Sequence, residues 1–281
     1  MPKPAAQPEE IRSCVMGWPV NHSLSPKMHG WWLELYHICG SYGMQAVEPK
    51  NLKDALQQLL DQGYAGCNLT LPLKEEALGL MDIHDESALT AGAVNTVVVK
   101  NGKLHGYDSD GYGFIENLKA QHADWSGERV AIVGTGGASR SIISSLKKAG
   151  AQRFVLVNRT RERAQKIIEN FELDADICDW ENRSKLLKDA TMLVNCTSLG
   201  MKGQPPLEID LAALPTTAVV CDLVYRPIMT PLLRQAAERG NPVVDGMGML
   251  IHQGRLGFKL WYGRDPEVTP EIYAFMKGCA A

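Results

Sequence analysis

The sequence lacks features that define several large classes of protein. Its seven cysteines include no Cys-x-x-Cys pair, and its 29 basic and 32 acidic residues give a formal charge of −3. The missing cysteine pairs argue against a zinc site or a disulfide framework, and the missing basic excess argues against nucleic-acid binding. We therefore expect no metal and no nucleic-acid partner, and we expect reduced thiols in a cytoplasmic protein.

Long apolar runs are also missing. The longest apolar stretches, such as residues 218–221, are far too short to cross a membrane. Residues 1–10 are polar and proline-rich, without the apolar segment of a secretory signal. A hydrophobic content of 45% in 281 residues is typical of a globular chain and allows two domains. We therefore expect a folded protein without a membrane partner.

Short strand-like runs alternate with helical patterns along almost the whole sequence, which is typical of βα units. This alternation predicts an α/β fold with mostly parallel sheets covered by helices. A domain boundary is expected near Asp110, and a second one at residues 245–248, where two glycines suit a hinge or a close backbone approach. The expected strands are Cys14–Gly17, Met44–Val47, Gly66–Leu69, Val94–Val99, Val130–Val133, Phe154–Val157, Met192–Asn195, Val219–Asp222 and Val243–Val244, and the expected helices include Lys53–Gln62, Gly113–Ala120, Ser141–Ala149, Arg161–Glu169, Pro231–Arg239 and Met249–Tyr262.

A glycine-rich loop follows the expected strand that ends at Val133. Residues 134–139 read G-T-G-G-A-S and lead into a helical pattern, which is the context of a dinucleotide-binding fingerprint. Gly134 permits a tight turn, and Gly136 lets backbone N–H groups approach a pyrophosphate at the helix N-terminus. An ordinary glycine-rich turn is the alternative interpretation.

The next expected strand ends in a basic segment. An NAD-selective site has an acidic residue about 20 positions after the glycine loop, but here Asn158 is followed by Arg159, Thr160 and Arg163. Guanidinium groups and a hydroxyl suit a 2′-phosphate, since arginine forms bidentate, charge-assisted hydrogen bonds to it. The segment favours NADP over NAD. The alternative is a solvated helix start in which Arg163 pairs with a neighbouring glutamate.

Polar residues gather where the strands of the first half end. Ser25 precedes Pro26, so local pattern favours a helix N-cap for Ser25, although the Ser23 and Ser25 hydroxyls could also converge on a carboxylate. A lysine at position 74 is by default solvent-exposed. Polar residues at strand ends of an α/β protein mark the crevice where ligands bind, and here they are Asn68, Thr70, Lys74 and Asn95.

Together these motifs resemble the shikimate dehydrogenase family. They follow the family order over nearly the whole chain. The motifs are G-x-P-x-x-H-S-L-S-P at 17–26, N-L-T-x-P-x-K at 68–74, G-A-V-N-T at 92–96, G-x-G-G-A-S-R at 134–140, N-R-T-x-x-R at 158–163, N-x-T-S-x-G-M at 195–201, D-L-V-Y-x-P at 222–227 and D-G-x-G-M-L-x-x-Q at 245–253.

The resemblance implies the reversible reduction of 3-dehydroshikimate to shikimate with NADPH, on the route to aromatic amino acids. It implies a substrate-binding domain of residues 1–110, completed by 247–281, and a Rossmann-like NADP-binding domain of residues 111–246. The family's catalytic lysine and its partner aspartate fall on Lys74 and Asp110. Its substrate contacts fall on Ser23, Ser25, Asn68, Thr70, Asn95, Tyr225 and Gln253. Its cofactor contacts fall on Gly134, Thr135, Gly136, Gly137, Ala138, Asn158, Arg159, Thr160, Arg163, Thr197, Leu223, Gly246 and Met249. The sequence leaves a monomer or a homodimer open.

One departure from the family pattern precedes the expected catalytic aspartate. The family has G-x-N-T-D-G, whereas this chain has Asp108 and Ser109 before Asp110. A second carboxylate could raise the pKa of one of the two aspartates, or Asp108 could cap the following helix. The change leaves open a paralogue that acts on quinate or an aminated shikimate. A folate-linked methylene dehydrogenase would need different motifs in the first half, and a non-catalytic NADP-binding protein would be favoured by loss of Lys74 or Asp110, which are both present.

Overall fold

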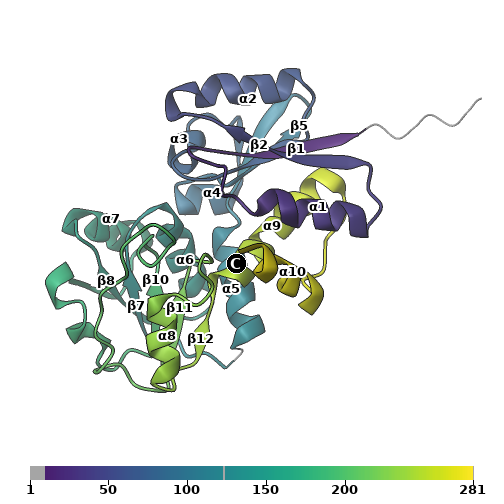
Figure 1. Cartoon of the computed structure of the whole chain (residues 1–281). Helices are drawn as coiled ribbons and strands as arrows, with labels where there is room; N and C mark the ends of the chain where they lie inside the picture. Colours follow the sequence, from purple (N-terminus) through teal and green to yellow (C-terminus); the bar gives the residue numbers. More distant parts are fainter. Residues whose placement is uncertain (1–9, 123, 281) are drawn as a thin grey trace, which may run out of the picture. The chain divides into compact units, whose positions relative to one another are not determined.

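The computed structural model describes residues 10–122 and 124–280, which form two compact units (Figure 1). Unit 1 comprises the chain up to Leu89, Ala93–Tyr107 and Gly254–Glu267. Unit 2 comprises Thr90–Gly92, Asp108–Gln253 and the residues from Val268 on, a segment that the sequence analysis assigns to the first domain. Each unit contains one six-stranded sheet. The predicted α/β class is thereby confirmed.

Unit 1 has a mixed sheet in the order β2-β1-β3-β5-β6-β4. Strand β1 is parallel to β2 and β3, and β4 is parallel to β6, whereas β5 is antiparallel to both of its neighbours. The elements are β1 (Ile11–Gly17), α1 (Ser25–Leu35), β2 (Gly40–Ala46), α2 (Leu52–Asp61), β3 (Gly66–Leu69), α3 (Lys74–Leu78), β4 (Ile83–His84), α4 (Glu86–Ala91), β5 (Thr96–Lys100) and β6 (Lys103–Tyr107), with the second part of α9 (Gly246–Tyr262).

Two layers of side chains pack on the two faces of the sheet in unit 1. Leu52, Leu56 and Leu59 recur at helical spacing on α2. They belong to the core on one face of the sheet, together with Cys67 and Leu69 of β3. On the other face, aromatic side chains of α1 and α9 form a second layer in which Trp32 and Phe258 are fully buried. The Trp261 indole N–H donates to the Val97 carbonyl (2.9 Å) and fixes α9 against the sheet.

Unit 2 has an all-parallel sheet in the order β12-β11-β10-β7-β8-β9. The chain order reverses between β7 and β10, which is the switch point where a doubly wound fold binds its ligand. The elements are α5 (Asp110–Gln121), β7 (Arg129–Val133), α6 (Gly137–Lys148), β8 (Arg153–Val157), α7 (Arg161–Phe171), β9 (Ala175–Cys178), β10 (Met192–Asn195), β11 (Val219–Asp222), α8 (Pro231–Glu238), β12 (Val243–Val244), the first part of α9 and α10 (Pro270–Ala280).

Helices cover both faces of this second sheet. Successive side chains of each strand point to opposite faces, so nearly all of them are buried. Val130 and Ile132 of β7 pack with α5, α6 and α7, while Ala131 and Val133 pack with α8 on the other face (Figure 1). The strands are therefore apolar at almost every position, as in other parallel sheets. Among the described residues, no helix combines the length and apolarity of a membrane span.

The nine expected strands are confirmed, with small changes at their ends. The sequence analysis missed β4, β6 and β9, because these strands are short or alternate polar with apolar residues near a sheet edge. Helix α9 begins at Gly246 rather than at Met249. A helix can begin there because the Asp245 carboxylate accepts a hydrogen bond from the Met247 N–H (3.0 Å).

Gly248 lets α9 approach α5 closely. A Cβ at position 248 would lie 1.8 Å from Asn117 Oδ1, and Asn117 is buried with its amide donating to the Asp245 carbonyl (2.7 Å). The two glycines of this segment thus serve a close backbone approach, one of the two interpretations that the sequence allows.

We expect Gly248→Ala to destabilise the protein by about 1–3 kcal/mol, because the methyl group must displace a buried, hydrogen-bonded side chain. The measurement is the free energy of unfolding in urea. Gly278→Ala is the matched control, since it also lies in a helix and its Cβ would meet nothing within 4 Å. This control should gain up to about 1 kcal/mol from helix propensity. Equal stabilities of the two variants would contradict the packing argument.

Candidate active site

A hydrogen-bonded cluster occupies the end of the sheet in unit 1 where β3 ends and β5 begins. The Tyr42 hydroxyl donates to Asn68 Oδ1 (2.7 Å), and Asn68 Nδ2 donates to the Asn95 carbonyl and to Thr96 Oγ1 (both 3.1 Å). Thr96 Oγ1 in turn donates to Asn95 Oδ1 (2.9 Å). Asn68 and Asn95 are buried, so these bonds hold their amides in fixed orientations. We call these four residues the amide cluster.

The two serines predicted after β1 join this cluster through Tyr42. Ser25 hydrogen-bonds the Tyr42 phenol, whose pKa is raised by burial, and the Ser25 N–H donates to Ser23 Oγ (3.3 Å). The expected N-cap role of Ser25 is wrong: Ser25 is the first residue of α1, and the N-cap residue is Leu24. The reason is that Leu24 already adopts a helical conformation, and its carbonyl accepts the Met28 N–H (3.1 Å).

Thr70 and Lys74 lie at the same end of the sheet. The Thr70 N–H donates to the Met16 carbonyl (2.9 Å), which continues the pairing of β1 with β3. Lys74 is half-buried and begins α3, and its carbonyl accepts the N–H of Val94 (2.8 Å), the residue before Asn95. The structure thus gathers all six predicted site residues of unit 1 at one end of its sheet.

The glycine loop of unit 2 has the geometry of a phosphate-binding turn. Gly134 has φ +95°, and its N–H donates to the Val157 carbonyl at the end of β8 (2.8 Å). Gly136 is the N-cap of α6, and a Cβ there would meet nothing within 4 Å. Backbone N–H groups at this helix start are available to an anion. The Thr135 hydroxyl is buried and forms no hydrogen bond to the described residues.

The predicted 2′-phosphate segment lies at the end of β8 and is exposed. Asn158 Nδ2 donates to the Thr160 carbonyl (2.9 Å) and closes the turn before α7. The Arg159 guanidinium lies over the Trp180 ring, 6.0 Å from its centroid. Arg161, rather than Arg163, forms the ion pair that the structure shows here, with Asp179 (3.2 Å).

A buried polar cluster connects the loops that follow β10 and β11. Asn195 Nδ2 donates to Asp222 Oδ1 (2.9 Å), and Asn195 Oδ1 accepts from both the N–H and the hydroxyl of Thr197 (3.0 and 2.7 Å). Asp222 also accepts from the Val224 N–H (3.0 Å) and from the Thr230 hydroxyl (2.7 Å). Burial raises the Asp222 pKa to about 6, although these hydrogen bonds oppose the shift. We call Asn195, Asp222 and Thr230 the carboxylate cluster.

The remaining predicted residues of unit 2 lie in or beside the segments that follow its strands. Gly246 faces the Leu223 backbone, since a Cβ there would lie 2.4 Å from the Leu223 carbonyl oxygen. Met249 belongs largely to the core, so its side chain presents little surface to a ligand. Gln253 accepts from the Ser109 hydroxyl (3.4 Å). Tyr225 is half-buried after β11.

Asp108 resolves one of the alternatives that the sequence leaves open. Its Oδ1 accepts the backbone N–H of Asp110 (3.1 Å), so the carboxylate supports the start of α5. An asparagine, the family residue at this position, carries the same acceptor atom.

Sequence reasoning missed Tyr42, Thr96, Asn195 and Asp222. Thr96, Asn195 and Asp222 stand inside motifs that the resemblance rests on. Asn195 and Asp222 are also polar residues that end buried strands, which is a signal for a positioning role. Tyr42 carries no such local signal, because its bond to Asn68 depends on the sheet order β2-β1-β3. Among the described residues, no group of three histidine, cysteine or acidic side chains could hold a metal ion.

We expect Asp222→Asn to change how stability depends on pH. A carboxyl whose folded-state pKa is about 6, above its usual 3.8, stabilises the fold below pH 4 and loses that contribution as pH rises through 6. The stability of the native protein relative to Asp222→Asn should therefore fall by about 1–1.5 kcal/mol between pH 5 and pH 8. Urea unfolding of both proteins at the two pH values measures this difference. A difference that stays constant would contradict the raised pKa.

Known proteins match this chain along most of its length. The family model described as the shikimate dehydrogenase substrate binding domain matches residues 15–97, that of shikimate / quinate 5-dehydrogenase matches residues 116–201, and that of the shikimate 5′-dehydrogenase C-terminal domain matches residues 246–270. A relative from Dinoroseobacter shibae, named shikimate dehydrogenase (NADP(+)), is 48% identical over 263 residues, which are 92% of this chain and 95% of the relative.

Solved structures show the same similarity. The shikimate 5-dehydrogenase of Thermus thermophilus, in complex with NADP(H) and shikimate, is 36% identical with a TM-score of 0.85, covering 96% of this chain and 98% of that protein. The quinate dehydrogenase of Corynebacterium glutamicum, in complex with NAD, is 28% identical with a TM-score of 0.87 over 96% and 98% of the two chains. The resemblance seen in the sequence is confirmed, and the chain belongs to the shikimate dehydrogenase family.

Proposed function

We propose that the protein is a cytoplasmic, NADP-dependent oxidoreductase that reversibly reduces 3-dehydroshikimate to shikimate, on the route to aromatic amino acids. The observation that carries this proposal is the 48% identity, over 92% of the chain, to a relative named shikimate dehydrogenase (NADP(+)). The similarity to a structure in complex with NADP(H) and shikimate supports the same substrate and cofactor.

The residues of unit 2 fit NADP. The Thr135 hydroxyl is buried without a partner among the described residues, and the start of α6 offers backbone N–H groups to the pyrophosphate. Arg159, Thr160 and Arg163 are exposed at the end of β8, where they would hold the 2′-phosphate. When bound, the cofactor supplies or accepts the hydride. The carboxylate cluster would hold Thr197 and Leu223 in place beside it.

The residues of unit 1 suit a small hydroxylated acid. Ser23 and Ser25 would bind its carboxylate, and Asn68, Thr70 and Asn95 would hydrogen-bond its hydroxyl groups. Tyr225 and Gln253 are the remaining proposed substrate contacts. The amide cluster supports this assignment, because it fixes which atoms of Asn68 and Asn95 are donors and acceptors.

Lys74 and Asp110 would stabilise the charge that develops on the substrate and assist the proton transfer. During reduction, negative charge develops on the carbonyl oxygen, and the Lys74 ammonium would stabilise this charge and donate or relay the proton. Asp110 would hold that ammonium in place by its carboxylate. Both residues begin helices directly after strand-end segments, α3 and α5, and such positions are rigid enough to orient a reacting group.

A broader substrate range is the second candidate. Asp108 replaces the family asparagine, and one matching family model covers quinate as well as shikimate dehydrogenases. The carboxylate of Asp108 supports α5 through the Asp110 N–H, as an asparagine oxygen would. Because Asp108 makes a hydrogen bond that asparagine could also make, the replacement favours the narrower shikimate assignment.

We expect Lys74→Ala to lower the turnover of shikimate by about 10²- to 10⁴-fold, the usual contribution of a positioned proton-transfer group. NADP affinity, measured separately by fluorescence titration, should stay within about threefold of the native value, a change of under 1 kcal/mol. Lys100→Ala is a control on the same unit, at the exposed end of β5. A near-native rate in Lys74→Ala would remove Lys74 from the proposed role.

We expect Arg159→Ala to weaken NADP binding by about 10- to 100-fold and NAD binding far less, because only NADP presents the phosphate that the guanidinium would bind. The matched control is Arg161→Ala on the same segment, whose guanidinium is already paired with Asp179. Equal losses for both cofactors in Arg159→Ala would contradict the assignment of the 2′-phosphate site.

A further inference from the structure

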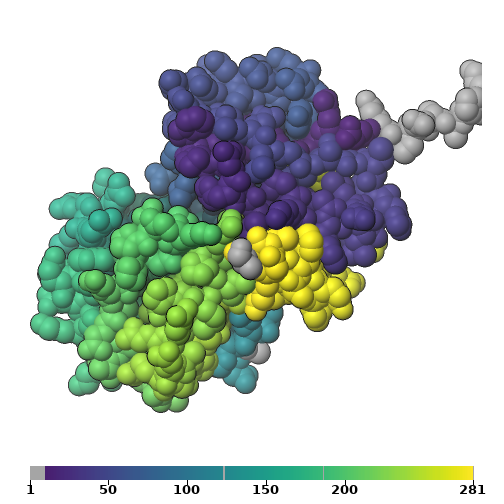
Figure 2. All heavy atoms as spheres, viewed as in Figure 1, coloured from purple at the N-terminus to yellow at the C-terminus, as the bar shows by residue number. Residues whose placement is uncertain are grey.

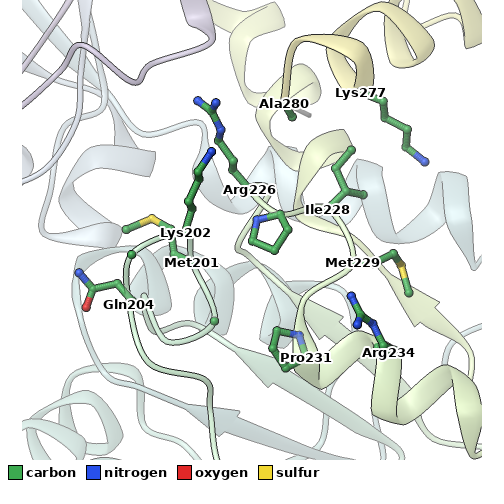
Figure 3. Close-up of a pocket in the computed structure, with 13 residues that line it drawn as sticks. Met201, Lys202, Gln204, Arg226, Ile228, Met229, Pro231, Arg234, Lys277 and Ala280 are labelled. Carbon is green, nitrogen blue, oxygen red and sulfur yellow. The ribbon is translucent and has the colours of Figure 1, made fainter.

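Unit 2 contains a further pocket. None of the residues proposed above to bind the substrate or the cofactor lines it. It has a volume of about 680 Å³, a size typical of small-molecule sites. It lies between the loop of residues 200–204, the segment of residues 226–229, α8 and α10 (Figure 3). Figure 2 shows the α8 and α10 segments on one visible face of the protein, in light green and yellow.

The charged residues that line this pocket are all cations. They are Lys202, Arg226, Arg234 and Lys277, and among the described residues no aspartate or glutamate lines the pocket. Lys277 already pairs with Asp245 (3.5 Å) and lies over the Tyr273 ring (4.7 Å). For the other three, the described part of the chain provides no ion pair. Such a set of like charges repels itself and attracts anions.

Among the lining residues, Arg226 indicates a bound anion most specifically. Its Nε is buried and lacks a hydrogen-bond partner among the described residues. A buried guanidinium N–H without an acceptor costs free energy, and an oxygen of a bound anion would remove that cost. The Lys202 N–H donates to the Arg226 carbonyl (2.9 Å), so the two cations are held on adjoining backbone segments.

Apolar surface separates the cations. In Figure 3, Lys202 and Arg226 extend in the same direction, while Arg234 lies beside Met229 and Pro231. Met229 is 40% exposed, and it lines the pocket together with Pro227, Ile228 and Pro231. An inorganic anion would contact only the cationic side chains and leave this apolar surface exposed to water. An organic anion would also cover the apolar surface.

We propose that this pocket binds a small organic anion, with one or more carboxylate or phosphate groups on a compact apolar body, at a site separate from those of NADP and the substrate. Arg226 and Lys202 bind the anionic group, Met229 and Pro231 contact the apolar body, and Arg234 supplies a second cationic contact. The proposal stands independently of the proposed catalytic function, because it uses none of the same residues.

The test is calorimetric titration of the full chain with phenyl phosphate, first alone, then with saturating NADP and, in a separate titration so that no turnover occurs, with saturating shikimate. We expect phenyl phosphate to bind at least about tenfold more tightly than inorganic phosphate or phenol, and to bind equally well in the presence of NADP or of shikimate. Binding that disappears when NADP or shikimate is present would overturn the separate site. Equal affinities for phenyl phosphate and inorganic phosphate would show an adventitious ion only.

Two exposed cations of unit 2 make a matched pair of variants. Arg234→Ala should weaken phenyl phosphate binding by about tenfold or more, the usual effect of losing a charge-assisted hydrogen bond. Lys166→Ala, on the exposed face of α7 away from the pocket lining, should bind phenyl phosphate as the native protein does. Equal affinities in the native protein and Arg234→Ala would contradict the assignment. Unfolding midpoints of both variants exclude misfolding as the cause of any loss.

Discussion

Buried amide and carboxylate groups must find hydrogen-bond partners, and in each unit this requirement holds the candidate site residues in place. In unit 1, Asn68 satisfies it by joining Tyr42, Asn95 and Thr96 across the part of the sheet formed by β2, β1, β3 and β5. In unit 2, Asn195 and Asp222 satisfy it by joining the loops after β10 and β11 to the start of α8. Among the groups that orient the proposed ligand contacts, Tyr42, Thr96, Asn195 and Asp222 are not proposed to touch a ligand themselves.

Close backbone approach is the second constraint on the site. Gly246 faces the Leu223 carbonyl, and Gly248 faces Asn117, so α9 begins against two other segments of unit 2. The same helix continues into unit 1, where Phe258 is fully buried among aromatic side chains. Helix α9 thus contributes to the cores of both units. A side chain larger than hydrogen at position 248 would disturb that packing.

Sequence reasoning succeeds where local pattern and structure agree. The apolar runs of β7, β8, β10 and β11 are easily recognised because both faces of their sheet are buried. It fails where long-range contacts decide, as in β6, whose strand forms by pairing with β5 despite a mixed pattern. Ser25 is a similar case, because its burial beside Tyr42 and the early start of α1 override its cap preference. The partners of Asn68 likewise depend on strand order, which no local motif encodes.

The central claim is that the protein oxidises shikimate with NADP, and steady-state rates with four pairings test it directly. Shikimate or quinate is combined with NADP or NAD, and the absorbance of the reduced nicotinamide is followed. We predict that shikimate with NADP has the highest kcat/KM, by at least about tenfold over each other pairing, which corresponds to 1.4 kcal/mol of discrimination. Turnover of quinate at the same efficiency, or no turnover in any pairing, would contradict the account.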